Sequence, residues 1–355
     1  MDQHSEMPRR KSDHLSLVAA GAVEFRERGT LLDQVHLVHQ ALPEMHVDEV
    51  DVSCQFLGKK LAAPLMISAM TGGIPEATAI NRDLARAAQA LGIGFGLGSQ
   101  RAMVLNPQVA STYQVRDVAP DILLLANLGM VQARQMSTGE IRSLVDSVGA
   151  DALCIHLNPA MELVQPGGDR DFRGGVDTLK RLSNELCKPI IAKETGCGMS
   201  RRAGIAAKEA GVAAIDVSGA GGTSWVGVET HRAAKAGDEA SKELGDAFWD
   251  WGIPTAASIA MLADLQVPLI ATGGLRNGMD VARSLALGAS LGGLAAPVFR
   301  AQQQGGYDGV LQFLKGIITA LTTATFLSGC QSAVHLREAP RVLGAELRAW
   351  IEQAV

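Results

Sequence analysis

The chain has 355 residues, of which 47% are hydrophobic, 4% aromatic and 19% charged, and its formal net charge at pH 7 is −5. This balance excludes the strongly basic surface that is typical of nucleic-acid-binding domains. The five cysteines lack CxxC spacing, so the sequence shows no zinc or dithiol motif. No apolar run approaches the roughly 18–20 residues that span a bilayer, and the polar N-terminus does not resemble a signal peptide. We therefore expect a cytoplasmic protein with neither a nucleic-acid nor a membrane partner.

Eight short apolar runs recur along the chain, most of them followed by a helical pattern. Such runs are typical of strands in a buried parallel sheet. Polar or glycine-rich residues follow each run directly, as chemistry at the C-terminal ends of strands would require. The pattern predicts an α/β fold, a (β/α)8 TIM barrel with an N-terminal extension and one active site on one face. The runs are Pro64–Ala69, Leu91–Leu97, Asp121–Ala126, Asp151–Leu157, Lys188–Ala192, Val212–Val217, Gln266–Ala271 and Ala289–Ala295.

The first 61 residues precede the predicted barrel, which we place at 62–355. Residues 1–15 are polar and basic, and we expect them to be mobile while the active site is empty. The segment 47–53 alternates in the manner of an edge strand, and we interpret 31–60 as a cap over the bottom of the barrel. The sequence thus predicts an arm and capping segment (1–61) ahead of the barrel.

Within the barrel, clear amphipathic patterns predict helices at Asn81–Leu91, Gly175–Leu186 and Arg201–Ala210, and a closing helix at Leu311–Leu327. The segment at about 227–255 is unusually long for a connection between a strand and a helix. It mixes charged residues with aromatic ones. Such a composition is compatible with a lid or a subunit contact, and equally with a variable surface loop.

Two glycine-rich loops are expected after the seventh and eighth strands, where barrels often bind phosphate. These loops are 273–278 and 292–297, and Arg276 lies within the first. Glycine lets backbone N–H groups approach an anion closely, and an arginine adds a charge-assisted hydrogen bond. A tight turn is the simpler explanation of a lone glycine pair, but this combination at this position favours a phosphate site.

The ends of the other strands suggest a planar ring above the same barrel mouth. Lys193 could stabilise such a ring when it is reduced and anionic, while the backbone at 69–71, Ser99 and Asn127 could bind its polar edge. A phosphate beside a ring of this kind indicates FMN. From its residue type alone, Lys193 could equally be a Schiff-base lysine or a structural partner of Glu194.

A series of motifs spread from Arg10 to Gly329 resembles one family, the type 2 isopentenyl diphosphate isomerases. The motifs occur in the family's order along nearly the whole chain. They are Arg10-Lys11 with His14, Ser68-Ala69-Met70-Thr71-Gly72-Gly73, Gly98-Ser99-Gln100-Arg101, Ala126-Asn127-Leu128-Gly129, His156-Leu157-Asn158-Pro159 with Glu162, Gln165-Pro166, Lys193-Glu194, Gly219-Ala220-Gly221-Gly222-Thr223-Ser224-Trp225 and Gly273-Gly274-Leu275-Arg276-Asn277-Gly278.

The resemblance implies a TIM-barrel isomerase of isoprenoid biosynthesis that interconverts isopentenyl diphosphate and dimethylallyl diphosphate by a 1,3-allylic proton shift. It implies FMN, kept reduced by NAD(P)H, together with Mg²⁺. The partner would be a small-molecule prenyl diphosphate, and the assembly a homotetramer or a homo-octamer.

The resemblance also implies roles for individual residues. Glu162 would hold Mg²⁺, and His156 and Met161 occupy the catalytic positions. The substrate would be bound by Arg10, Lys11, His14, Ser99, Gln100, Arg101, His156 and Asn158. FMN would be bound by Ala69, Met70, Thr71, Ser99, Asn127, Lys193, Ser218, Thr223, Gly274, Leu275, Arg276, Ala295 and Ala296.

Two positions depart from the family pattern. Met161 replaces a glutamine that can form hydrogen bonds, and a thioether accepts such bonds only weakly. Gly167 stands where many members have glutamate. Met161 therefore keeps an alternative open, an FMN enzyme of the same scaffold that acts on another prenyl diphosphate or as an oxidoreductase. A binding protein with little turnover is disfavoured, because it would not need the diphosphate arm and the metal ligand.

Overall fold

Eight parallel strands close into a barrel in the computed structural model, which describes residues 3–354. Around the barrel the strand order is β10-β11-β4-β5-β6-β7-β8-β9, so each strand pairs with its neighbours in sequence. Every predicted run overlaps one of these strands, which confirms the (β/α)8 prediction. The strands are β4 (Leu65–Ile67), β5 (Gly94–Gly96), β6 (Leu124–Gly129), β7 (Ala152–Leu157), β8 (Ile190–Glu194), β9 (Ala214–Asp216), β10 (Leu269–Ala271) and β11 (Leu291–Leu294).

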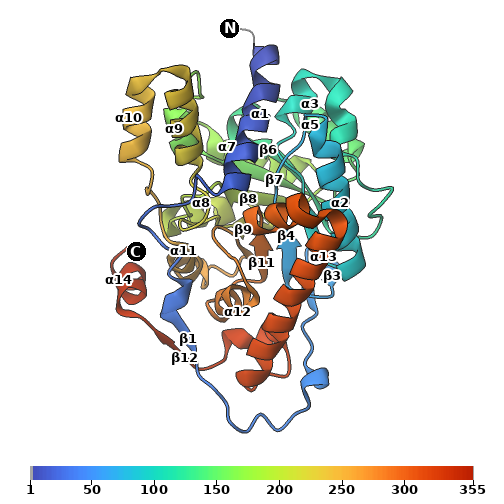
Figure 1. Ribbon diagram of the computed structural model, residues 1–355, viewed down its shortest axis with the longest axis vertical. Coiled ribbons are helices and arrows are strands. Elements are labelled where there is room, and N and C mark those ends of the chain that lie inside the picture. The colour runs from blue at the N-terminus through green and yellow to red at the C-terminus, as the bar shows by residue number, and fades with distance from the viewer. Residues whose placement is uncertain (1–2, 355) are drawn as a thin grey trace.

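Helices follow the strands and form the outer layer (Figure 1). The predicted helices at 81–91, 175–186 and 201–210 correspond to α2, α7 and α8. The helices are α1 (Gln3–Ala20), α2 (Glu76–Leu91), α3 (Arg101–Leu105), α4 (Met130–Gln135), α5 (Thr138–Ser147), α6 (Pro159–Val164), α7 (Gly175–Glu185), α8 (Arg201–Glu209), α9 (Trp225–Ala236), α10 (Glu239–Ala247), α11 (Thr255–Leu262), α12 (Gly278–Ala286), α13 (Ala296–Leu327) and α14 (Ala345–Gln353). Short 3-10 helices are η1 (Leu32–Gln34), η2 (Val47–Glu49), η3 (Pro107–Tyr113) and η4 (Ala333–Arg337).

The barrel interior is a small apolar cluster, separate from the larger core between the strands and the helices. Because side chains alternate along a strand, one set points inward and the next set outward. Cys54, Phe56 and Leu61 join the interior cluster from outside the barrel. They belong to the hairpin of β2 (Cys54–Phe56) and β3 (Lys59–Leu61), which therefore closes the end of the barrel opposite the strands' C-terminal ends.

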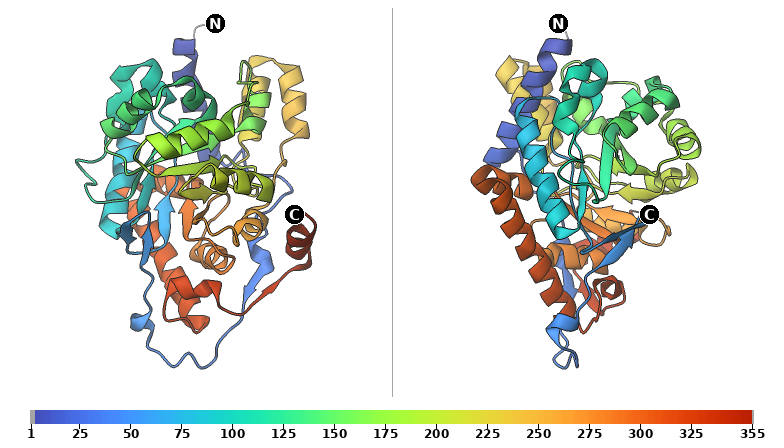
Figure 2. Two further views of the ribbon diagram at one scale, coloured as in Figure 1. Left: turned by 180° about the vertical axis from the view of Figure 1, so that it is seen from behind. Right: turned by 90° about the vertical axis from the view of Figure 1, so that its right-hand side faces the viewer.

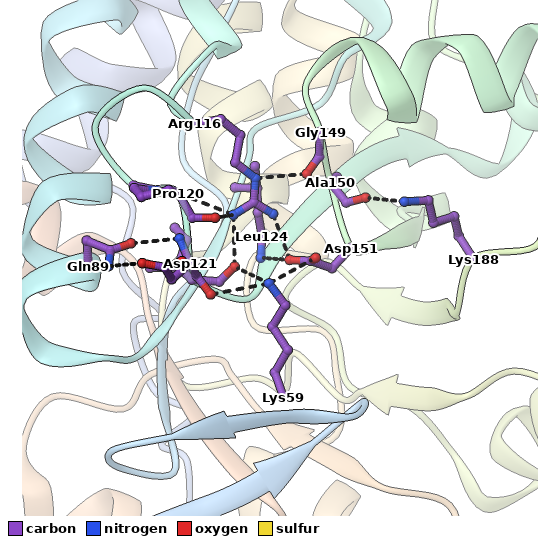
Figure 3. A network of polar contacts seen from close by, with 12 residues as sticks. Lys59, Gln89, Arg116, Pro120, Asp121, Leu124, Gly149, Ala150, Asp151 and Lys188 are labelled. Atoms are coloured by element: carbon purple, nitrogen blue, oxygen red, sulfur yellow. Dashed lines mark hydrogen bonds and ion pairs between the residues drawn. The ribbon is translucent and has the colours of Figure 1, made fainter.

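A polar network ties this hairpin to the barrel wall (Figure 3). The ammonium of Lys59 lies 3.0 Å from Asp151 and donates to the carbonyl of Ile122. Arg116 reaches the other oxygen of Asp151 at 2.8 Å. Arg116 also donates to the carbonyls of Gly149 and Ile122, so one arginine satisfies several loop carbonyls before the strands begin.

The segment before the hairpin differs from its prediction. Residues 47–53 form η2 and a single bridge from Asp51 to Ser332, so the edge-strand prediction is wrong there. His46 caps η2 by accepting from the backbone N–H of Asp48, a local bond that competes with strand pairing. Farther upstream, β1 (Val35–Leu37) pairs with the C-terminal β12 (Arg341–Leu343) on the outside of the barrel.

The long helix α13 contains the predicted closing helix. By length and composition it is the one described helix that could cross a membrane. It bends at Gly305 and Gly306, whose backbone is not helical, and one face is buried through Val310, Leu314 and Ile317. Figure 2 shows α13 running alongside α2, and these two helices share an extensive contact. Its place in the fold is that of the helix after the eighth barrel strand.

Two segments, one expected to be a long loop and the other a mobile tail, are helical. The 227–255 segment is mostly a hairpin of α9 and α10, which stands beside α1 at one end of the barrel (Figure 1). Residues 3–15, within the tail expected to be mobile, form most of α1; residues 1 and 2 lie outside the described part. Contacts with α9 and α13 stabilise α1 where its sequence alone gave no amphipathic signal.

Candidate active site

A large cavity opens at the C-terminal ends of the barrel strands. It holds about 1650 Å³ of empty space, part of it open to solvent. The predicted residues that line it are Arg10, Lys11, His14, Ala69, Met70, Thr71, Ser99, Arg101, Asn127, His156, Asn158, Met161, Glu162, Lys193, Ser218, Thr223, Gly274, Leu275, Arg276, Ala295 and Ala296. The barrel thus brings together almost every residue that the sequence indicated.

The floor of this cavity is a polar layer stacked on the apolar interior. Each of its members stands two residues after an inward-facing residue of the apolar cluster, as the alternation of a strand requires. For example, Lys193 stands two residues after Ile191, and Asp216 stands two residues after Ala214. The layer consists of the polar residues Ser68, Asn127, His156, Lys193, Asp216 and Thr272, together with Gly293.

One end of the cavity is a cradle of backbone N–H groups. Gly273 and Gly274 have φ values of 96° and 79°, which favour glycine, and α13 begins at Ala296 without a side-chain cap. The first N–H groups of a long helix are thereby left available to an anion. Two arginines flank this cradle, Arg276 and Arg300, and each lies 2.8 Å from Glu24. Arg276, which the sequence analysis predicted as an FMN ligand, lines the cavity beside the cradle. Arg300 also lines it and was not predicted.

The floor carries a buried ion pair. The ammonium of Lys193 lies 2.7 Å from Oδ2 of Asp216. Glu194, the alternative partner, points elsewhere and accepts from the backbone N–H groups of Thr195, Cys197 and Gly198. The structural pairing of Lys193 with Glu194 is therefore wrong.

His156 enters the cavity as a neutral imidazole. Its Nδ1 lies 2.8 Å from Oδ1 of Asn127, and because an amide oxygen only accepts, Nδ1 carries the proton. Burial, together with the charges of Lys193, Arg101 and Arg10, lowers the pKa of His156 to about 4. Its Nε2 is thus an acceptor rather than a donor at neutral pH.

Gln100 is the one predicted substrate residue that does not line the cavity. It is fully buried, and its side chain donates to the carbonyl of Leu144 while Oε1 accepts from the backbone N–H of Asn127. Its place is therefore behind the wall, where it fixes the strand that presents Asn127.

Glu162 faces the cavity from α6 with each carboxylate oxygen accepting one hydrogen bond. Oε1 accepts from Asn158 at 2.9 Å, and Oε2 accepts from the backbone N–H of Asp169 at 2.8 Å. A carboxylate has about four acceptor positions, so two remain for a cation. Within the described part of the chain no cluster of three or more His, Cys, Asp or Glu residues could hold a metal. A lone carboxylate suits Mg²⁺ bound mainly by water and phosphate.

The arm helix α1 brings Arg10 and Lys11 into the cavity. Arg10 donates to Oε1 of Gln165 at 3.0 Å, while its buried Nε has no partner. The ammonium of Lys11 instead contacts the carbonyls of Gly72 and Ser99 and the hydroxyl of Tyr113. Arg10 therefore offers a free donor to an anion, whereas Lys11 anchors the arm.

Several cavity residues were missed by the sequence analysis. Counting in steps of two from the apolar interior would have found Thr272, which lines the cavity, and Asp216, which lies beneath it, since both continue an inward-facing series. No comparable signal marks Glu24 or Arg300, which lie on a linker and on a helix. Gln132, also unforeseen, lines the cavity and donates to Asp169 at 2.9 Å.

Comparison with known proteins identifies close relatives along the whole chain. The family model described as FMN-dependent dehydrogenase matches residues 3–161 and 161–341. The isopentenyl-diphosphate delta-isomerase of Methanosarcina mazei is 44% identical over 97% of this chain and 94% of its own length. The enzyme of the same name from Pyrococcus furiosus is 42% identical over 100% of this chain and 91% of its own length.

Solved structures share the fold at much lower identity. A flavocytochrome b2 matches with a TM-score of 0.68 and 18% identity over 95% of this chain and 84% of that one. A mandelate oxidase variant matches with a TM-score of 0.62 and 18% identity over 89% and 90% of the two chains. These structures show that the barrel fold is shared. FMN, which the matching family model names, fits the glycine cradle, the uncapped α13 terminus and the unpartnered hydroxyl of Ser68. Taken with relatives that are 42–46% identical over nearly their full length, the fold and the cavity show that this chain belongs to the FMN-dependent, type 2 isopentenyl-diphosphate delta-isomerases.

Proposed function

We propose that this cavity interconverts isopentenyl diphosphate and dimethylallyl diphosphate, with reduced FMN and Mg²⁺, in isoprenoid biosynthesis. The observation that carries the proposal is one cavity with two separate basic regions. Arg276 lines it beside the glycine cradle after β10, whereas Arg101, after β5, lines it together with Arg10 of α1. Two phosphorylated ligands, a cofactor and a substrate, match that arrangement.

FMN would place its phosphate in the cradle and its ring over the polar floor. Gly274, Leu275 and Ala296 would donate backbone N–H groups to the phosphate, and Arg276 would add a charge. When bound and reduced, the flavin supplies an acid and base beside the carbon–carbon double bond and an electron-rich surface that stabilises positive charge there. The ring and its side chain would face the other residues of the FMN set: Ala69, Met70, Thr71, Ser99, Asn127, Lys193, Ser218, Thr223 and Ala295.

The substrate diphosphate would bind under the arm. Arg10 has a buried Nε without a partner, and burial lowers the pKa of its guanidinium, so an incoming anion would relieve an unfavourable state. Arg101, Ser99, His14 and Asn158 line the same end of the cavity. Leu15 and Val18 of α1 add apolar surface that would exclude water from the five-carbon tail.

Glu162 would hold Mg²⁺ against the diphosphate. Glu162 lines the cavity and keeps two acceptor positions unused, so it could hold a hard dication, which would neutralise negative charge of the diphosphate. Neutral His156 would accept a hydrogen bond through Nε2, whereas Met161 offers no donor near the substrate. The chain's own groups that can donate a proton in this region are therefore few.

The remaining parts of the proposal concern the environment of the enzyme. NAD(P)H would reduce the flavin, and the location would be cytoplasmic. A homotetramer or a homo-octamer would cover surface such as Phe248 and Trp251, which are 41% and 61% exposed and pack edge to face. We also propose that 1–61 acts as an arm and cap, and 62–355 as the catalytic barrel.

An anaerobic assay tests the function directly. Purified protein is supplied with FMN, NADPH, Mg²⁺ and isopentenyl diphosphate, and the product is analysed. We expect dimethylallyl diphosphate to form while NADPH is consumed only to the amount of flavin, because isomerisation has no net redox change. Continued NADPH consumption without dimethylallyl diphosphate would instead favour an oxidoreductase of the same scaffold.

A further inference from the structure

We propose that Asp216 is a positioning residue that keeps Lys193 charged and directed at the flavin ring before the flavin is reduced. This inference rests on the proposed binding of FMN over the polar floor. Lys193 lines the cavity, whereas Asp216 lies beneath it and does not. Asp216 would therefore act on the cofactor only through the lysine.

The barrel register places the two residues side by side. Lys193 on β8 is the register partner of Asp216 on β9, and both follow inward-facing residues of the apolar interior. Their side chains are 12% and 2% exposed, and the ammonium lies 2.7 Å from Oδ2. At this burial the pair is poorly screened by water, so loss of one partner would leave the other charge uncompensated.

Thr272 fixes the carboxylate from the third strand. Its hydroxyl donates to Oδ1 of Asp216 and lies 3.4 Å from the ammonium of Lys193. Asp216 therefore uses one oxygen for the lysine and the other for the threonine. Rotation of the carboxylate is thereby restrained, and the ammonium of Lys193, which lines the cavity, is held beside it.

The other titratable groups on the neighbouring strands do not replace Asp216. His156 is neutral, with its pKa lowered to about 4 by burial and by nearby cations. Burial raises the pKa of the Cys154 thiol to about 12, so it also stays neutral. Burial likewise raises the pKa of Glu194 to about 8, and its carboxyl group contacts backbone N–H groups behind the strand.

The consequence concerns when the lysine acquires its proton. Burial disfavours the charged form of Lys193. Beside an oxidised, uncharged ring, the negative charge of Asp216 offsets this desolvation cost. With the pair intact, Lys193 is already charged when the ring becomes anionic. Without Asp216, the lysine would be neutral beside the oxidised ring and would take up a proton together with the electrons.

The test is the pH dependence of the two-electron reduction potential of bound FMN, measured between pH 6 and 9. For wild type we expect about one proton taken up per flavin reduced, and for Asp216→Asn about two, by thermodynamic linkage. Thr272→Val is the matched control, since it removes the hydrogen bond but keeps the charge, and it should retain the wild-type slope. When Lys193→Met is already present, adding Asp216→Asn should no longer change the slope.

An unchanged slope in flavin-loaded Asp216→Asn would overturn the inference while leaving the proposed function intact. If the Asp216→Asn variant does not hold FMN, Asp216→Ser is measured instead, because a smaller side chain leaves room for water at the same neutral charge. Wild-type protein that takes up no FMN on titration would overturn the proposed function itself, and this inference with it. The two failures are thus distinguished by the wild-type flavin spectrum alone.

Discussion

His14 of the arm helix and Glu229 of α9 lie 3.0 Å apart, Nε2 to Oε1, although 215 residues separate them. Glu229 is fully buried and also pairs with Arg232, and the ring of His14 packs edge to face on Trp225 at 5.3 Å. The buried carboxylate of Glu229 thus forms part of the surface on which the arm helix docks. Burial opposes ionisation of Glu229, but the hydrogen bond from His14 and the nearby cations outweigh it, so its pKa is lowered.

Docking of the arm should weaken in acid. Burial lowers the pKa of His14 from its ordinary value of 6.5, so the free arm binds a proton more readily than the docked arm. Docking is then fully favourable above about pH 6.5 and is lost progressively as the pH falls below it. The KM for isopentenyl diphosphate should rise from pH 7.5 to 5 more steeply in wild type than in His14→Gln. Taking the ratio of the two proteins cancels the titration of the substrate itself, and parallel curves would contradict the role of His14.

Arg10 and Lys11 should differ in function despite their adjacent positions. Arg10→Ala removes a charged donor to the diphosphate and should cost about 1.5–3 kcal/mol of substrate binding, roughly a 10- to 150-fold rise in KM. Removal of residues 1–15 should do at least as much and leave FMN affinity unchanged. Lys11→Met keeps the length of the side chain but loses the contacts with Gly72 and Tyr113, so its arm should be cleaved faster by a protease. A truncated protein with normal KM would show that the arm has no part in catalysis.

Binding of the FMN phosphate should depend on Arg276 and Arg300, the two arginines that flank the cradle. Arg276→Ala and Arg300→Ala should each weaken FMN binding, by about 1.5–3 kcal/mol where a charge-assisted hydrogen bond is lost. Arg82→Ala, which removes a surface ion pair with Asp117, is the control and should bind FMN as wild type does. The measurement is a fluorescence titration of the apoprotein with FMN. Equal affinities for all four proteins would place the phosphate elsewhere.

Turnover should require a divalent cation through Glu162. Glu162→Gln keeps the shape of the side chain but removes the negative charge, so isomerisation should collapse while FMN binding survives. Glu352→Gln, on the exposed surface of α14, should change neither property. EDTA should abolish wild-type turnover, and Mg²⁺ should restore it; activity that persists in EDTA would remove the metal from the reaction.

The turnover of Met161→Gln should show whether the hydrogen-bonding side chain that the family pattern has at this position matters here. The sulfur of Met161 lies 3.9 Å from the amide nitrogen of Asn158, and an amide in its place could both donate and accept there. If proton transfer limits the wild type, turnover should rise, since general acid–base groups contribute about 10²–10⁴-fold. A fall in turnover with isopentenyl diphosphate would show that Met161 shapes the pocket for another prenyl diphosphate. A wild type that is already fast and unaffected by the change would show that this position is dispensable.

The strands, the glycine cradle and most cavity residues could be predicted because their signals are local. An apolar run followed by polar residues gives a buried strand and its C-terminal end wherever it occurs, and a closed parallel barrel gathers all such ends on one face. Lys193, Asn127 and Arg276 were therefore identified without any knowledge of distant contacts. The helix α1 and the α9–α10 hairpin escaped this reasoning, because packing on neighbouring elements stabilises them more than their own patterns do.

What only the tertiary structure decided is which partner each polar group has. Lys193 pairs with Asp216 rather than with its neighbour Glu194, because alternation along β8 turns consecutive side chains to opposite faces. Gln100 is adjacent to Ser99 in sequence yet lies behind the cavity wall. Glu24 and Arg276 meet across 252 residues, a pairing that depends on the closed barrel and on the path of the linker after α1. The sequence determined which chemical groups this site contains, and barrel closure determined how they are joined.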